Sequence, residues 1–358
     1  MRRIAAVTAV LVLLFSLPVC AEGLSVPDID GYAGFGETVS EIASGSFSLD
    51  PIDILNNVID GIMAELRSFA SDAAVITVMA LLSSAVGTLN TPLGESAAGR
   101  ASFFAFFTVI SGLALSCFQT ALTYGTEVIS LMTGFMTKLT PVLVLMLFTC
   151  CKTASAAAFE PVLSAAVFVV SVVIEKCLVP LMTFSAVLSV AGNIGDRSKI
   201  SGFIKIVRSV TKWLMALVIT LFTGINAIYG FSAAALDAVG AKTIKFAVGS
   251  LVPVVGGFLS DTLETVASSA SLLKNAAGIS GMLIICGICV TPVIKIGIMQ
   301  LLLKLAAAMT EPVTDGRISS MIWDMSEAVT SVFGTVILTA VLFLINICII
   351  LTATGVSG

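Results

Sequence analysis

Long apolar runs follow one another along most of this chain, from residue 73 to residue 354, with only short and weakly charged segments between them. Charged residues make up 11% of the sequence, whereas they make up about a quarter of an ordinary soluble domain. The mean hydropathy is +1.10. A helix needs about 20 apolar residues to cross the hydrocarbon core of a bilayer, and runs such as 101–122 and 278–303 reach that length. We therefore expect the chain to fold in a membrane.

These runs favour helices over barrel strands. In hydrocarbon, the backbone N–H and C=O groups must form hydrogen bonds within a helix or between the strands of a closed barrel. Barrel strands alternate apolar and polar residues, but these runs are apolar on every side. We predict an all-α, polytopic integral membrane helix bundle with about eight transmembrane helices behind a signal peptide. The predicted spans are residues 73–89, 101–122, 128–151, 156–174, 177–192, 213–235, 278–303 and 331–353.

The N-terminus, residues 1–21, is typical of a secretory signal peptide. Arg2 and Arg3 precede an apolar core, and a short stretch that ends at Ala21 is the predicted cleavage site. Two alternatives stay open. The segment could remain as a first membrane helix, or Cys20 could be lipidated, although Val19 is bulkier than the residue that a lipoprotein site prefers.

An acidic segment follows over residues 22–72, and we expect it to lie outside the cytoplasm. It holds ten acidic residues and one basic residue, a charge of −9, while residues 73–358 hold 12 acidic and 15 basic residues, a charge of +3. Asp50 and Pro51 predict the start of an amphipathic helix inside it. The helix could lie against the membrane surface or could bind an external partner. The negative charge argues against binding to nucleic acid or anionic lipid.

Residues 73–236 are predicted to hold a first group of transmembrane helices, with short external turns at 123–127 and 175–176. The segment 193–212 is predicted to be a basic cytoplasmic loop, because positive residues concentrate on the cytoplasmic side of membrane proteins. It contains Arg197, Lys199, Lys205, Arg208 and Lys212 against one acidic residue, Asp196.

Residues 237–277 do not fit a simple crossing. The apolar part, 246–259, is short and interrupted by Gly and Pro, which favours a re-entrant segment. If residues 246–259 cross the membrane instead, the C-terminus lies on the other side of the membrane. The polar face of the following amphipathic stretch could meet a water-filled cavity or bulk water. Residues 278–354 are predicted to hold the C-terminal transmembrane helices.

Charged residues within apolar runs are candidate functional residues, because charge is costly in hydrocarbon. Lys138 and Lys295 lie inside such runs and could pair with Glu175, Asp261 or Glu264. Gly278 and Gly281 suit close helix packing. The candidate conduit or packing residues are Lys138, Asp261, Glu264, Lys274, Asn275 and Lys295.

The sequence predicts no enzyme, no cofactor and no metal site. It contains no histidine, which removes the usual general base and the Ser-His arrangement, and it contains no Gly-rich nucleotide loop. Cys286 and Cys289 have the spacing of a metal or redox pair, but they have no second pair. Zinc needs four ligands, so buried cysteines that act as small apolar side chains are the simpler interpretation.

Four strings in the second half are distinctive: KFAVGSLVPVVGGFLSDT at 245–262, SLLKNAAG at 271–278, PVIK at 292–295 and KLAAA at 304–308. Through these strings and the order of its segments, the chain resembles the stage III sporulation protein AE family over essentially its whole length. The resemblance is most specific over residues 242–308.

The resemblance implies a permease-like subunit of a secretion-like channel that joins mother cell and forespore and is needed for late forespore development. It implies a multi-pass location in the mother-cell membrane around the forespore. The implied partners are the lipid bilayer, the other stage III A proteins including a separate ATPase, and, indirectly, the forespore stage II protein Q. Within such a channel, residues 246–275 are predicted to line the conduit.

The alternative function is a stand-alone secondary transporter of a small solute. Its site would combine Lys138, Lys295 and the interrupted segment 246–259. Inverted internal repeats would favour this alternative, and none is evident between residues 73–192 and 213–353.

Overall fold

The structure is a computed structural model that describes residues 35–44, 51–90, 97–149, 153–194, 202–225, 256–314 and 316–352. The signal peptide, Cys20 and most of the segment 246–259 lie outside these residues. Every regular element among the described residues is helical. The elements are α2 (Phe35–Ser44), α3 (Pro51–Asn90), α4 (Ala97–Thr149), α5 (Thr153–Val173), the π-helix η2 (Ile174–Leu178), α6 (Val179–Ile194), a helix over Gly202–Ile225, α8 (Gly256–Thr310) and α9 (Gly316–Thr352).

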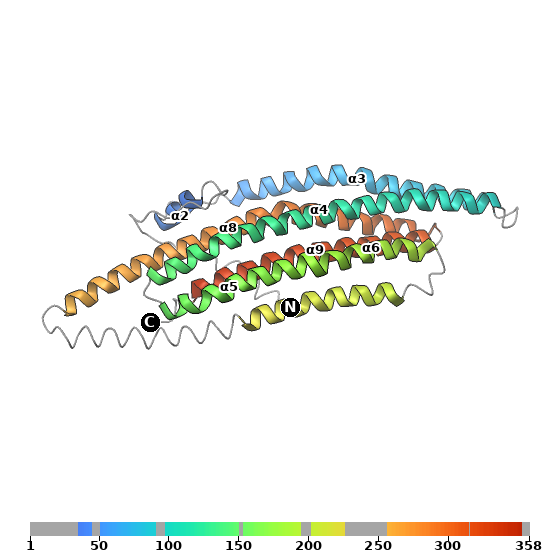
Figure 1. Ribbon diagram of the computed structural model, residues 1–358. Helices are drawn as coiled ribbons and strands as arrows, with labels where there is room; N and C mark the ends of the chain where they lie inside the picture. Colours follow the sequence, from blue (N-terminus) through green and yellow to red (C-terminus); the bar gives the residue numbers. More distant parts are fainter. Residues whose placement is uncertain are drawn as a thin grey trace.

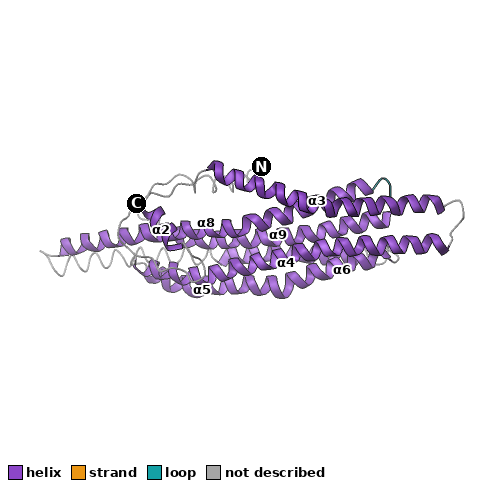
Figure 2. Ribbon diagram, turned by 90° about the horizontal axis from the view of Figure 1, so that it is seen from above, coloured by secondary structure: helices purple, strands orange, loops and turns teal. Residues whose placement is uncertain are grey.

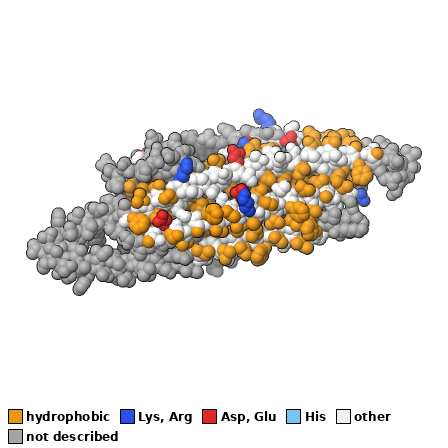
Figure 3. Space-filling view, in the orientation of Figure 1, with side chains coloured by type: hydrophobic (Ala, Val, Ile, Leu, Met, Phe, Trp, Pro, Cys, Tyr) orange, Lys and Arg blue, Asp and Glu red, His pale blue; other side chains and the backbone are white. Residues whose placement is uncertain are grey.

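The long helices run side by side along one axis and form an elongated bundle (Figures 1 and 2). Helix α9 packs against α4, α6 and α8. Just over half of the α9 span (56%) is buried, against at most 28% of any other span. Apolar side chains cover much of the outer surface (Figure 3). Helix α9 is therefore the centre of the bundle, and the other helices expose apolar faces as membrane helices do.

Six helices among the described residues are long and apolar enough to cross a membrane. They are Glu65–Ala85, Ala101–Phe148, Glu160–Ile194, Gly202–Ile225, Ser271–Thr310 and Gly316–Leu351. Eight spans were predicted. The difference arises because two pairs of predicted spans are each one continuous helical rod. The predicted spans 101–122 and 128–151 are both part of α4, and the predicted spans 156–174 and 177–192 are joined through η2.

The predicted external turn at 123–127 is wrong, because α4 continues through it. Gly125 lies where α4 crosses α9 and α8, and a Cβ atom there would come within 2.6 Å of the Val332 side chain and 3.8 Å of Ile296. This glycine therefore permits close packing and does not mark a turn. At 1.5 Å per residue, the uninterrupted α4 is about 80 Å long, well beyond the ~30 Å of a hydrocarbon core.

The predicted turn at 175–176 is also wrong. The chain stays helical through η2, where the N–H of Val179 bonds to the carbonyl of Ile174, five residues back. Pro180 follows directly. Proline has no N–H to donate and its ring clashes with the carbonyl four residues earlier. The widened π turn accommodates this proline without ending the helix.

Three further helical stretches differ in extent from the helices that the sequence predicts. Residues 202–212 of the predicted basic loop are helical, and so are residues 35–44 of the acidic segment. Helix α3 starts at Pro51 as predicted, but it continues to Asn90 and joins the amphipathic helix to the first span. In α2, Val39 and Ala43 are buried, and α2 packs on α8. This packing explains why α2 is ordered as a helix.

The close-packing role predicted for Gly278 and Gly281 is confirmed. A Cβ atom at Gly278 would overlap the Leu351 side chain of α9, and one at Gly281 would come within 2.6 Å of Leu139 in α4. Small residues at these points let the backbones of α8, α9 and α4 approach closely.

We expect Gly278→Leu to destabilise the bundle by about 1–3 kcal/mol, because the new side chain overpacks the contact with Leu351. Gly287→Leu in the same helix is the matched control, since nothing lies within 4 Å of a Cβ atom at Gly287. Both changes gain the same helix propensity. Reversible unfolding in mixed micelles by sodium dodecyl sulfate would measure the difference. Equal stability of the two variants would contradict the close packing of α8 on α9.

Candidate functional site: ionic contacts inside the bundle

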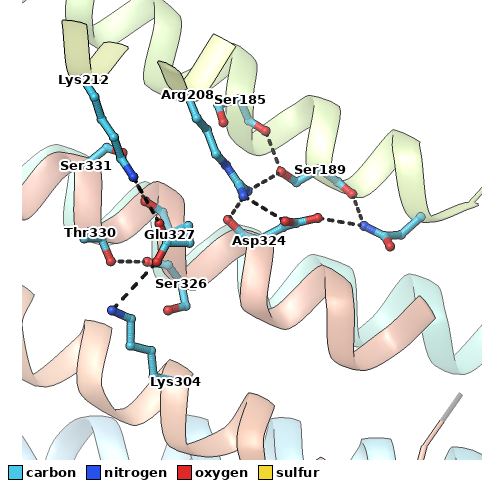
Figure 4. A network of polar contacts seen from close by, with 11 residues as sticks. Ser185, Ser189, Arg208, Lys212, Lys304, Asp324, Ser326, Glu327, Thr330 and Ser331 are labelled. Carbon is cyan, nitrogen blue, oxygen red and sulfur yellow. Dashed lines mark hydrogen bonds and ion pairs between the residues drawn. The ribbon is translucent and has the colours of Figure 1, made fainter. Parts of the chain in front are cut away.

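The first ionic cluster joins α6, the Gly202–Ile225 helix and α9 around Arg208 and Asp324 (Figure 4). Arg208 Nη1 lies 2.9 Å from Asp324 Oδ1, and Nη2 donates to the backbone carbonyl of Asp324 at 2.7 Å. The two side chains are only 17% and 14% exposed. Arg208 Nη2 also donates to the Ser189 hydroxyl at 3.2 Å. The guanidinium therefore ties three helices to one point.

Asn193 completes this cluster from the end of α6. Its Nδ2 donates to Asp324 Oδ2 at 3.3 Å and to the Ser189 carbonyl at 2.7 Å. Within the described part of the chain, Arg208 Nε and Asn193 Oδ1 are buried and have no hydrogen-bond partner. The cluster is therefore strongly connected through Asp324 but is not fully satisfied by the residues described.

Glu327, one turn after Asp324, lies between two lysines. Its Oε2 is 3.8 Å from Lys212 Nζ, and its Oε1 is 3.9 Å from Lys304 Nζ. Lys212 belongs to the same helix as Arg208, and Lys304 belongs to α8. Figure 4 shows the lysines approaching Glu327 from opposite sides. With Arg208, three positive groups thus face the two carboxylates of α9.

A second contact joins α3, α4 and α8. Lys295 Nζ lies 2.8 Å from Glu65 Oε1, and the two side chains are 25% and 21% exposed. The same ammonium lies 5.0 Å from the centre of the Tyr124 ring, a cation–π arrangement. Lys295 was predicted to pair with Glu175, Asp261 or Glu264, and that prediction is wrong because α3 brings Glu65 beside it.

Lys274 is completely buried and caps α9. Its Nζ donates to the carbonyls of Ile350 at 3.0 Å and Leu351 at 3.1 Å. The last four carbonyls of a helix have no partner within it, and the C-terminal end of the helix dipole is negative. A lysine ammonium at this place therefore satisfies two carbonyls and complements the dipole.

The other predicted residues do not join these contacts into one site. Lys138 is exposed on α4, and Asn275 is half-buried beside Lys274. Asp261 and Glu264 lie in α8, but their side chains are outside the described set. Glu175 pairs with its neighbour Lys176 at 2.7 Å. Lys274 and Lys295 are about 31 Å apart along α8, from a rise of 1.5 Å per residue.

Asp324, Glu327 and Glu65 were not predicted from the sequence as site residues. The last span was predicted to start at 331, so both carboxylates were assigned to the preceding loop. A start at Gly316 leaves only Arg317, Asp324 and Glu327 as charges in the 36-residue span. The spacing of Asp324 and Glu327 on one apolar helix was the available signal.

Among the described residues no cluster of histidine, cysteine, aspartate or glutamate has the arrangement of a metal site. Cys286 and Cys289 are free thiols, and Cys289 Sγ bonds to the Cys286 carbonyl at 3.4 Å. The contacts described above are ion pairs and helix caps that join helices.

Comparison with known proteins agrees with the family resemblance that the sequence strings indicate. The model of a family described as stage III sporulation protein AE matches residues 33–354. The stage III sporulation protein AE of Bacillus subtilis strain 168 is 27% identical over 316 residues, which cover 88% of this chain and 79% of that protein. No solved structure matches the chain.

We expect Arg208→Met to destabilise the bundle by about 2–4 kcal/mol, because it leaves Asp324 without its cation in a mostly buried place. Lys205→Met removes an exposed cation from the same helix and should change stability by less than about 0.5 kcal/mol. The double variant Arg208→Met with Asp324→Leu should regain at least half of the loss. Unfolding in mixed micelles measures all three. A double variant no more stable than Arg208→Met would contradict the assigned ion pair.

We expect Lys274→Met to fray the end of α9, because the Ile350 and Leu351 carbonyls lose their donor. Hydrogen exchange measured by mass spectrometry should be at least about tenfold faster over the last turn of α9, since one lost charged hydrogen bond is worth roughly 1.5–3 kcal/mol. Lys138→Met is the control, an exposed lysine in α4. Unchanged protection in Lys274→Met would show that the lysine does not cap the helix.

Proposed function

The chain belongs to the stage III sporulation protein AE family, and we propose that it is the permease-like membrane subunit of the channel between mother cell and forespore. Family membership implies a role in stage III of sporulation. The observation that carries the proposal is the family match over residues 33–354, which includes all six candidate spans. The six spans support a multi-pass membrane protein.

Ionic contacts inside the bundle support a structural rather than an enzymatic role. Arg208, Glu327 and Lys295 each join two or more helices, and Lys274 caps α9. Such contacts hold long helices in register. We propose that energy for transport comes from the separate ATPase of the same complex, and that the chain assembles with the other stage III A proteins and, indirectly, with stage II protein Q.

The bundle supports one orientation in the membrane. Three candidate spans lie between the start of α3 and the end of α6, which supports placing these two points on opposite sides of the membrane. Five spans were predicted before the basic loop 193–212. Three and five are both odd, so the proposed cytoplasmic side of this end of the bundle does not change. The Ser84 hydroxyl of α3 donates to the carbonyl of Val313, which supports the same side for the 311–314 turn as for the end of α3. The acidic α2 packs on α8 and would face the space between the two membranes.

The separation of the two lysines weighs against the transporter alternative. Lys295 lies over Tyr124, and Lys138 is 14 residues further along α4, a separation of about 21 Å at 1.5 Å per residue. The two lysines therefore do not converge on one small solute. We accordingly keep the channel subunit as the proposed function.

The experiment is deletion of the gene in the bacterium that encodes the chain, with complementation. We expect heat-resistant spore counts to fall by several orders of magnitude, with arrest after engulfment, and the wild-type gene to restore them. A fluorescent fusion should locate at the membrane around the forespore, and affinity purification from sporulating cells should recover the other stage III A proteins. Normal spore counts without the gene would refute the proposed function.

A further inference from the structure

The exposed face of α4 is polar in its middle and apolar at both ends. The middle part, here called the α4 polar face, consists of exposed residues at three- and four-residue steps: Ser116, Gln119, Thr123, Glu127, Ser130, Gly134, Thr137 and Lys138. Leu131, 50% exposed, is the apolar exception in this stretch. Phe104 and Val109 before it, and Leu145 and Phe148 after it, are exposed apolar residues. Figure 3 shows a band with few apolar side chains along the part of the surface where α4 lies in Figure 1.

The length of this face matches a membrane. Ser116 and Lys138 are 22 residues apart, which corresponds to about 33 Å at 1.5 Å per residue. The hydrocarbon core is about 30 Å thick. A polar face of this length on an otherwise apolar, 48-residue candidate span could therefore reach across the whole core.

Not every residue of this face excludes lipid. The hydroxyls of Thr123 and Thr137 donate to carbonyls of their own helix, so these threonines would be tolerated in hydrocarbon. Gln119 and Glu127 are different, because an amide and a carboxylate are costly there and normally face a protein interior or water.

The surface is also hollowed at one end of this face. A shallow groove of about 310 Å³ is lined by Ser116, Gln119, Thr120, Thr123 and Tyr124. Its polar lining favours water over lipid beside this end of α4.

We propose that the α4 polar face lines a water-filled path across the membrane. The proposal rests on the proposed function and deepens it. Charged and polar side chains are a normal lining of hydrated pores.

Depth-matched controls are available on α8. A Cβ atom at Gly125 would lie 3.8 Å from Ile296, and one at Gly281 would lie 2.6 Å from Leu139. The two helices are therefore antiparallel, and this register puts Ser130 at the depth of Val290 and Ser116 at the depth of Leu305. Val290 is 39% exposed and Leu305 is 53% exposed. Both are apolar positions on the outer surface of the bundle.

The test is cysteine labelling in a chain whose native cysteines have been replaced and which still forms spores. Ser116, Thr123 and Ser130 are changed to cysteine one at a time, and Val290→Cys and Leu305→Cys are the controls. Membranes made permeable from both sides are treated with a charged methanethiosulfonate. The thiolate is the reacting form and needs water to ionise, so we expect the α4 positions to react at least about 100-fold faster than the controls.

The outcomes separate the alternatives. If Ser130→Cys reacts as slowly as Val290→Cys, the face lies in lipid or in a dry contact and the proposal is overturned. If Ser130→Cys and Val290→Cys both react fast, the membrane depth that these two positions share lies outside the hydrocarbon core, and the proposal is again overturned.

Spore counts of the same cysteine variants separate this inference from the proposed function. Variants that sporulate normally but label slowly would overturn the water-filled path and leave the channel role intact. Failure of the proposed function would show itself differently, as normal sporulation after deletion of the gene.

Discussion

Charge inside a membrane bundle needs a partner, and α9 is organised by that requirement. Asp324 and Glu327 lie one turn apart on the most buried helix, where unpaired carboxylates would be strongly destabilising. Arg208, Lys212 and Lys304 supply the positive groups from two other helices. The pairing therefore sets how the Gly202–Ile225 helix and α8 are aligned with α9.

The far end of α9 is held by a different contact. Lys274 donates to the Ile350 and Leu351 carbonyls, and Gly278, one turn later in α8, leaves room for the Leu351 side chain. Between the two ends, Gly125 lets Val332 approach α4. Helix α9 is thus positioned by ion pairs near its start, by close packing along its length and by a lysine cap at its end.

Continuity of the long helices links this architecture to the proposed path. Two predicted turns are absent because Gly125 serves packing and because a π turn absorbs Pro180. As a result α4 is one continuous helix that carries the α4 polar face on its exposed side, and the charged pair at η2 lies on the adjoining rod. The ionic contacts that hold the bundle together face inward, whereas Gln119 and Glu127 are exposed on α4, where contact with lipid would be costly.

Composition and apolar run length were sufficient to establish a membrane protein made of helices, because a backbone in hydrocarbon has so few ways to satisfy its hydrogen bonds. The strings between residues 242 and 308 were sufficient to indicate the family. The helix junctions at 123–127 and 175–176 and the partners of Lys295 and Lys274 depended on packing between distant segments. Arg208 and Asp324 are 116 residues apart in the chain. No local pattern of apolar or charged residues encodes which of several carboxylates meets a given cation, because that choice follows from how the folded helices cross.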